Sequence, residues 1–218
     1  MIVLGVDPSF SDAGLSIVDM QETKVEFIQG YQVKTLPKIP DLERIEYIIQ
    51  TIDEVTKDYP DYSVGLEIPF PGGQMSAKLY TLFISLLAHF KSKKKFISAF
   101  ANTQAHALVQ ETKGKRTKVE LKTAMIEAFR NETGFDKKLK SDAAEAYFLA
   151  KHGGMFLQLF DGHIKPEGLG YRQDEIFMSD KWNSKKTGRK GMLYRPWESY
   201  YDYRTTAPVA DGNVKCLR

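Results

Sequence analysis

The sequence predicts an α/β protein built on one mixed, five-stranded sheet with helices on both faces. Its first 33 residues hold three short apolar strands joined by turns, which is typical of antiparallel pairing. Two later strands each follow a helical segment, and strands linked through helices run parallel to their neighbours. Further helical segments complete the first 154 residues and provide cover for the sheet.

The three early strands are recognised from their apolar runs. Residues 2–6 are apolar and rich in β-branched side chains, which indicates a buried strand. A turn-forming stretch at 8–14 precedes a second strand at 15–18, so the two strands form a hairpin. Residues 25–33 alternate well enough between apolar and polar side chains to predict the third strand.

The middle of the chain alternates between helices and strands. Apolar residues recur at helical spacing over 41–57, and Asp41 is placed to cap this helix. A short strand is predicted at 62–67 and a second helix, apolar on much of its surface, at 75–90. A fifth strand follows at 95–100.

The last helical segments close the predicted domain. A short helix is predicted at 103–109, a longer one at 118–129 and a final one at 143–151, which a Gly-Gly pair is expected to end. We therefore expect one domain over residues 1–154. Residues 155–218 form a C-terminal extension that is rich in basic and aromatic side chains.

Composition favours a polyanionic partner over a membrane. No apolar run reaches the about 18 residues needed to span a bilayer, and the N-terminus lacks the features of a signal peptide. The single cysteine, Cys216, cannot form an internal disulfide, which fits a cytoplasmic protein. Residues 111–154 carry 10 basic and 7 acidic groups, and residues 181–218 carry 9 and 3. Such basic segments are typical of nucleic-acid binding, although a solvated surface would carry the same charges.

Four carboxylates lie next to apolar core segments, where burying the charge of an isolated acid would destabilise the fold. Asp7 and Glu67 end two apolar strands, and Asp142 and Glu145 are three residues apart on one face of the last helix. Converging carboxylates repel one another, and burial disfavours their charged form. Divalent metal ions relieve this repulsion, and Mg²⁺ prefers oxygen ligands. The pattern predicts a metal site, although each acid alone could be a helix cap or a surface charge.

The sequence around these acids resembles RuvC-type Holliday junction resolvases. The segment GVDPS at 5–9, followed by GLSIV at 14–18, resembles the opening of that family. Leu66-Glu67 resembles its second motif, and DAAEA at 142–146 resembles its last. The resemblance covers about residues 1–154.

The resemblance implies a fold, a cofactor and an assembly. It implies an RNase H-like fold, a homodimer with two active sites, and Mg²⁺ as the cofactor, with Mn²⁺ as an alternative. It also implies that the four carboxylates are the catalytic metal ligands. Lys118 matches a family lysine near the scissile phosphate, and Phe70 matches an aromatic residue that stacks on bases near the junction centre.

Two features depart from the bacterial members of the family. Glu145 stands where they usually have aspartate, a change that keeps the ligand chemistry. The chain after residue 155 is also longer, so the protein resembles a divergent, phage-encoded branch whose members cut several branched structures.

Basic residues are expected to flank the site and to neutralise DNA phosphates. The residues predicted to bind DNA in this way are Lys113, Lys115, Arg116 and Lys122. The predicted function is a structure-selective endonuclease that cuts four-way and other branched DNA by attack of water activated at the metal. Two alternatives stay open: a non-catalytic protein that binds branched DNA, and an RNase H-like nuclease that acts on another nucleic acid.

Overall fold

The computed structural model describes residues 1–21, 24–69, 74–101, 109, 117–135 and 140–165. Within those ranges the side chains at 74–76, 101, 118 and 160 are not described. None of the helices in this part of the chain combines the length and the apolar character needed to cross a lipid bilayer.

The sheet contains the five strands that the sequence predicts, each within three residues of its expected bounds. β1 pairs antiparallel with β2, and β2 with β3, whereas β4 runs parallel to both β1 and β5. The strand order is β3-β2-β1-β4-β5, so β1 lies at the centre of the sheet. The strands in the described chain are β1 Ile2–Asp7, β2 Asp12–Met20, β3 Val25–Lys34, β4 Ser63–Ile68 and β5 Ile97–Ala101.

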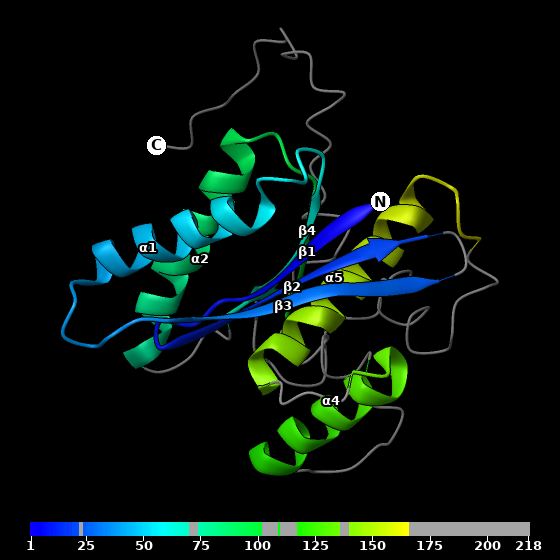
Figure 1. The fold of residues 1–218 in the computed structure, drawn as a ribbon. Helices are drawn as coiled ribbons and strands as arrows, with labels where there is room; N and C mark the ends of the chain where they lie inside the picture. The colour runs from blue at the N-terminus through cyan, green and yellow to red at the C-terminus, as the bar shows by residue number, and fades with distance from the viewer. Residues whose placement is uncertain (22–23, 70–73, 102–108, 110–116, 136–139, 166–218) are drawn as a thin grey trace, which may run out of the picture.

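Helices cover both faces of the sheet, which confirms the predicted fold class (Figure 1). Apolar side chains of the first two helices meet strand residues such as Leu66 in one core cluster, and those of the last two meet Val18 in another. The short helix predicted at 103–109 lies outside the described residues, except for Val109. The described helices are α1 Asp41–Thr56, α2 Gln74–Ser92, α4 Lys118–Thr133 and α5 Ser141–Phe160.

The last helix is longer than the sequence predicts. It continues through Gly153 and Gly154 to Phe160, so the prediction that this glycine pair ends the helix is wrong. A β-carbon on Gly153 would lie 3.0 Å from the Cα atom of Gly65, and one on Gly154 would lie 2.5 Å from the side chain of Met20. The pair therefore allows close packing between helix and sheet. The division into domains at residue 154 stays a prediction, and residues 166–218 of the predicted extension lie outside the described residues.

One helix cap differs from the sequence analysis, and another was not predicted. The N-cap of α1 is Pro40, and the carboxylate of Asp41 instead forms ion pairs with Arg44 at 3.2 Å and Lys78 at 2.8 Å. The prediction that Asp41 caps α1 is therefore wrong. At α4, Thr117 and Glu120 form a reciprocal capping box, which fixes where this helix begins.

A row of small residues crosses the sheet beneath α5. Cross-strand pairing aligns, from β3 to β5, the residues Gly30, Ser16, Gly5, Gly65 and Ser98. A β-carbon on Gly5 would lie 1.7 Å from the main-chain oxygen of Ala146, and one on Gly65 would lie 2.0 Å from that of Leu149. Ser16 Oγ donates a 2.7 Å hydrogen bond to the main-chain oxygen of Ala143. The row thus lets the backbone of α5 lie directly on the sheet.

Candidate metal centre

A second row of residues, two positions further along each strand, carries polar side chains toward the same face. Asp7 on β1 is paired with Gly14 on β2, and Gly14 is paired with Gln32 on β3. Val6 is paired with Leu66, so Glu67 follows on β4 beside Asp7. Since side chains alternate between the two faces of a strand, this polar row lies on the face that α5 covers.

Three carboxylates meet at this point. Ligand oxygens of Asp7, Glu67 and Glu145 all lie within 4.8 Å of one another. Asp7 and Glu67 are partly exposed at the ends of adjacent parallel strands, and Glu145 is buried on α5. Glu145 directly precedes Ala146, whose main-chain oxygen lies over Gly5. The row of small residues beneath α5 therefore allows the helix to lie close enough to the sheet for the Glu145 carboxylate to meet Asp7 and Glu67.

The electrostatics of the triad favour a bound cation. Desolvation by the surrounding protein raises the pKa of the Asp7 carboxyl group well above its ordinary value. The charges of the neighbouring acids, Glu67 first, raise the pKa of Asp7 further, and Lys122 alone among these neighbours opposes them. Three carboxylate oxygens in one place also match the donor preference of Mg²⁺. The residues present therefore fit a divalent metal ion.

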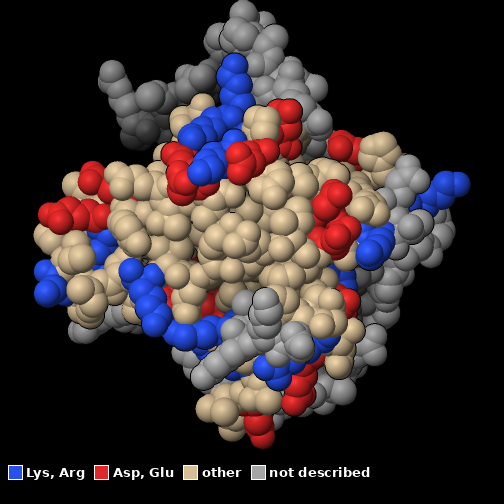
Figure 2. Space-filling view, in the orientation of Figure 1, with Lys and Arg blue, Asp and Glu red and all other residues tan. Residues whose placement is uncertain are grey.

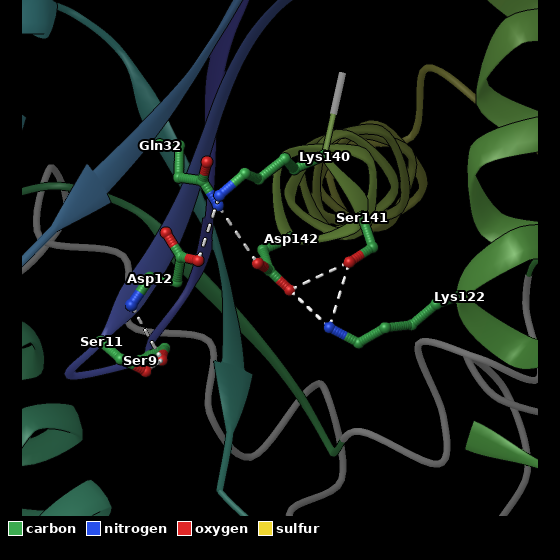
Figure 3. A network of polar contacts seen from close by, with 8 residues as sticks. All are labelled: Ser9, Ser11, Asp12, Gln32, Lys122, Lys140, Ser141 and Asp142. Atoms are coloured by element: carbon green, nitrogen blue, oxygen red, sulfur yellow. Dashed lines mark hydrogen bonds and ion pairs between the residues drawn. The ribbon is translucent and has the colours of Figure 1, made fainter. Parts of the chain in front are cut away.

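The fourth predicted ligand, Asp142, is close enough for its charge to raise the pKa of Asp7, and it has partners of its own (Figure 3). Lys122 Nζ lies 2.8 Å from its Oδ1 atom, and Ser141 Oγ lies 3.2 Å from the same oxygen. Gln32 Nε2 donates to the Oδ2 atom at 3.4 Å. The structure therefore brings three of the four predicted ligands together and gives Asp142 a separate set of contacts.

Lys122 is a basic side chain that contacts Asp142 and whose charge also acts on Asp7. Partial burial alone would lower the pKa of its ammonium group. The hydrogen bond to Asp142, together with the charges of the surrounding acids, raises the pKa above its ordinary value. Lys122 therefore stays protonated in the neutral range and keeps a positive charge at the edge of the site.

A second ion pair fastens the start of α5 to the sheet. Lys140, the N-cap of α5, lies 3.4 Å from the Oδ2 atom of Asp12 at the start of β2 (Figure 3). The main-chain N–H of Asp12 donates to Ser9 Oγ at 3.3 Å, which ties the pair to the β1–β2 turn. These contacts add to those that hold the first turn of α5 against β2.

Basic side chains also lie on the surface around this end of the sheet. Lys34 at the end of β3 is exposed, and the side chains of Lys122 and Lys140 are 39% and 48% exposed. Figure 2 shows, on the face in view, Lys and Arg side chains together with some Asp and Glu side chains below a broad uncharged area. This part of the surface suits an anionic polymer.

Several predicted site residues lie outside the part of the chain that the structure describes. Phe70 and the three basic residues of the loop before α4 lie outside the described residues; those three are Lys113, Lys115 and Arg116. Lys118 is the first residue of α4, and its side chain is not described. Sequence reasoning missed Gln32 as a neighbour of the site. The signal for Gln32 would have been its place opposite Gly14, which requires the strand register.

Comparison with known proteins shows the fold of the chain. No protein-family model and no curated protein matches it. A structure of RuvC from Thermus thermophilus is 21% identical, covers 75% of this chain and 98% of its own, and superposes with a TM-score of 0.59. A structure of Thermus thermophilus RuvC in complex with a Holliday junction substrate is 23% identical, covers 69% and 90%, and has a TM-score of 0.57. The chain therefore has a RuvC-like fold, as the sequence resemblance implied.

Proposed function

We propose that this chain is a metal-dependent DNA endonuclease that resolves four-way junctions. The observation that carries the proposal is the triad of Asp7, Glu67 and Glu145, with ligand oxygens within 4.8 Å of one another at the end of the central strands. Three carboxylates this close together repel one another unless a cation is bound. The backbone of α5, which carries Glu145, lies directly on the strands that carry Asp7 and Glu67. The RuvC-like fold supports a nuclease over an unrelated carboxylate protein.

The triad would hold the metal, with Asp142 completing the ligand set. Mg²⁺ is the ion we propose, with Mn²⁺ as an alternative, because all the donors are carboxylate oxygens. A divalent ion bound there would polarise a phosphodiester and lower the pKa of water. The products would carry 5′-phosphate and 3′-hydroxyl ends.

The protein side chains have separate tasks in this proposal. Asp7, whose pKa is raised by burial and by the charges of Glu67, Glu145 and Asp142, would be the central ligand. Lys122 holds a positive charge beside the acids and would contact the phosphate that undergoes cleavage, where negative charge develops. Lys118 begins the same helix, one turn before Lys122, and is proposed to support that charge as well.

The substrate is proposed from the fold and the surface charge together. The Thermus thermophilus protein of similar fold has been seen with a Holliday junction substrate, and we extend that substrate class to this chain. Exposed lysines around the site would neutralise the phosphates of the junction arms. Lys113, Lys115 and Arg116 are proposed to extend this contact, and Phe70 to stack on bases near the junction centre.

Symmetric resolution needs two sites, so we propose a homodimer. Sedimentation of the purified full-length chain should give twice the monomer mass at micromolar concentration. A monomer at every concentration, with paired nicks still produced, would show that a dimer is not required.

Cleavage of a labelled synthetic four-way junction tests the proposed activity. We expect paired nicks with Mg²⁺, and no cleavage with EDTA or with Asp7→Asn, which should still bind the junction because it removes a negative charge. Asp58→Asn, the same change at an exposed position after α1, is the matched control and should cut normally. Tight binding without cleavage by the wild type would favour the non-catalytic alternative. Preferred cutting of an RNA–DNA hybrid would favour a different nuclease.

A further inference from the structure

The two oxygens of Asp142 are held by different elements of the fold. Oδ1 accepts from Lys122 on α4 at 2.8 Å, and Oδ2 accepts from Gln32 on β3 at 3.4 Å (Figure 3). The side chain of Asp142 is only 17% exposed, so solvent has little access to it. Its orientation is therefore set by these protein contacts, together with that from Ser141 at 3.2 Å.

The position of Gln32 follows from the strand register. Gln32 is the cross-strand partner of Gly14, and a β-carbon on Gly14 would lie 2.0 Å from the main-chain oxygen of Asp142. The missing side chain at Gly14 lets the first turn of α5 settle onto β2. Gln32, half-buried on the neighbouring edge strand, then lies within reach of the Asp142 carboxylate.

The two contacts differ in what a nucleic acid would do to them. Lys122 carries a mobile point charge, and an incoming phosphate competes with Asp142 for it. Gln32 is neutral and has a planar amide, so a phosphate does not draw it away. Gln32 is thus the contact from a neighbouring strand that continues to fix the plane of Asp142 once Lys122 moves to the substrate.

We propose that Gln32 is a positioning residue that orients Asp142 toward the metal held by Asp7, Glu67 and Glu145. This inference rests on the proposed function, because it assigns Gln32 a role at that same metal site. Hydrogen-bond partners of metal ligands commonly change metal affinity by about 10–100-fold when they are removed. The long distance of 3.4 Å places Gln32 at the lower end of that range.

The test measures Mn²⁺ binding by the full chain, without DNA, by isothermal titration calorimetry. Gln32→Leu keeps the size of the side chain and removes the donor, so we expect Mn²⁺ affinity to fall about 10-fold. In an Asp142→Asn background the same change should alter affinity less than about 2-fold, because a residue that acts through Asp142 has no effect without it. Gln29→Leu, the same change at an exposed position on β3, is the matched control and should bind normally.

The outcomes separate this inference from the proposed function. If the wild type binds Mn²⁺ and Gln32→Leu binds it equally well, the role of Gln32 is overturned while the metal site stands. An equal loss in both backgrounds would show that Gln32 acts on the fold and not through Asp142. If the wild type binds no Mn²⁺, the metal site and this inference fail together. Gln32→Met serves as a second variant, and metal-free melting temperatures identify any variant that fails to fold.

Discussion

Substitution of Gly5 by alanine tests how closely α5 must lie on the sheet. The new β-carbon would stand 1.7 Å from the main-chain oxygen of Ala146 and 2.8 Å from the main-chain nitrogen of Ala150. Ordinary contact begins near 3.4 Å, so one of the two backbones must move by about 1.7 Å. Neither contact involves a flexible side chain that could rotate away. The helix therefore has to rise from β1, and Glu145 rises with it.

The expected cost follows from this geometry. Overpacking a core typically costs about 1–3 kcal/mol, and in a domain of this size each kcal/mol lowers the melting temperature by about 2–4 °C. We therefore expect Gly5→Ala to melt about 2–12 °C below the wild type. Because Glu145 leaves the triad, we also expect a loss of Mn²⁺ binding and of junction cleavage larger than the loss of stability alone would cause.

The neighbouring position in the same row supplies the control. Ser16→Ala removes one hydrogen bond to α5 without adding volume and should cost about 1 kcal/mol while preserving metal binding. Calorimetric melting and Mn²⁺ titration of both variants distinguish the two effects. A Gly5→Ala protein with wild-type stability and wild-type Mn²⁺ affinity would refute the claim that direct backbone contact builds the site.

Two further predictions concern charged groups. Burial, with a smaller contribution from Lys151, lowers the pKa of His152 to about 3, and neither ring nitrogen has a hydrogen-bond partner. Below about pH 6.5 the unfolded chain gains a proton that the folded chain cannot take up, so stability should fall by up to about 1.4 kcal/mol per pH unit toward pH 3. Urea unfolding at several pH values should show a weaker fall in His152→Leu, and equal slopes would contradict the assignment. Lys122→Met should raise the Mn²⁺ affinity of the free chain, because a competing cation is lost, and should lower junction cleavage; unchanged values of both would exclude Lys122 from the site.

The fold was predictable because its signals are local. Apolar runs mark the strands, and the turn between 8 and 14 marks the first hairpin. The errors came where tertiary contacts override local rules. A Gly-Gly pair such as Gly153 and Gly154 is typical of a helix end. Both glycines instead pack closely against the sheet, and α5 continues through them to Phe160. Asp41 has the character of a cap, but ion pairs with Arg44 and Lys78 hold its carboxylate.

The candidate site was predictable as a set of acids but not as an arrangement. The apolar strands ahead of Asp7 and Glu67, and the small residues around Glu145, show that these acids must lie close to a core. Their meeting depends on register, which no local pattern fixes. Gln32 is a further example, since an isolated glutamine in a strand carries no functional signal until it is known to lie opposite Gly14.

The path of α5 across the sheet explains why Asp142 stands apart from the triad. The main-chain oxygens of Asp142, Ala146 and Leu149 lie over Gly14 on β2, Gly5 on β1 and Gly65 on β4, in that order. The helix thus passes from β2 to β4 as it proceeds, and its acids meet different strands. Glu145, next to Ala146, lies over the central strand and reaches the acids of β1 and β4. Asp142, one turn earlier, lies over β2, where Gln32 from β3 and Lys122 from α4 are its neighbours. The spacing of three residues, which puts both acids on one face of the helix, therefore gives them different partners, because the helix crosses the strands instead of following one.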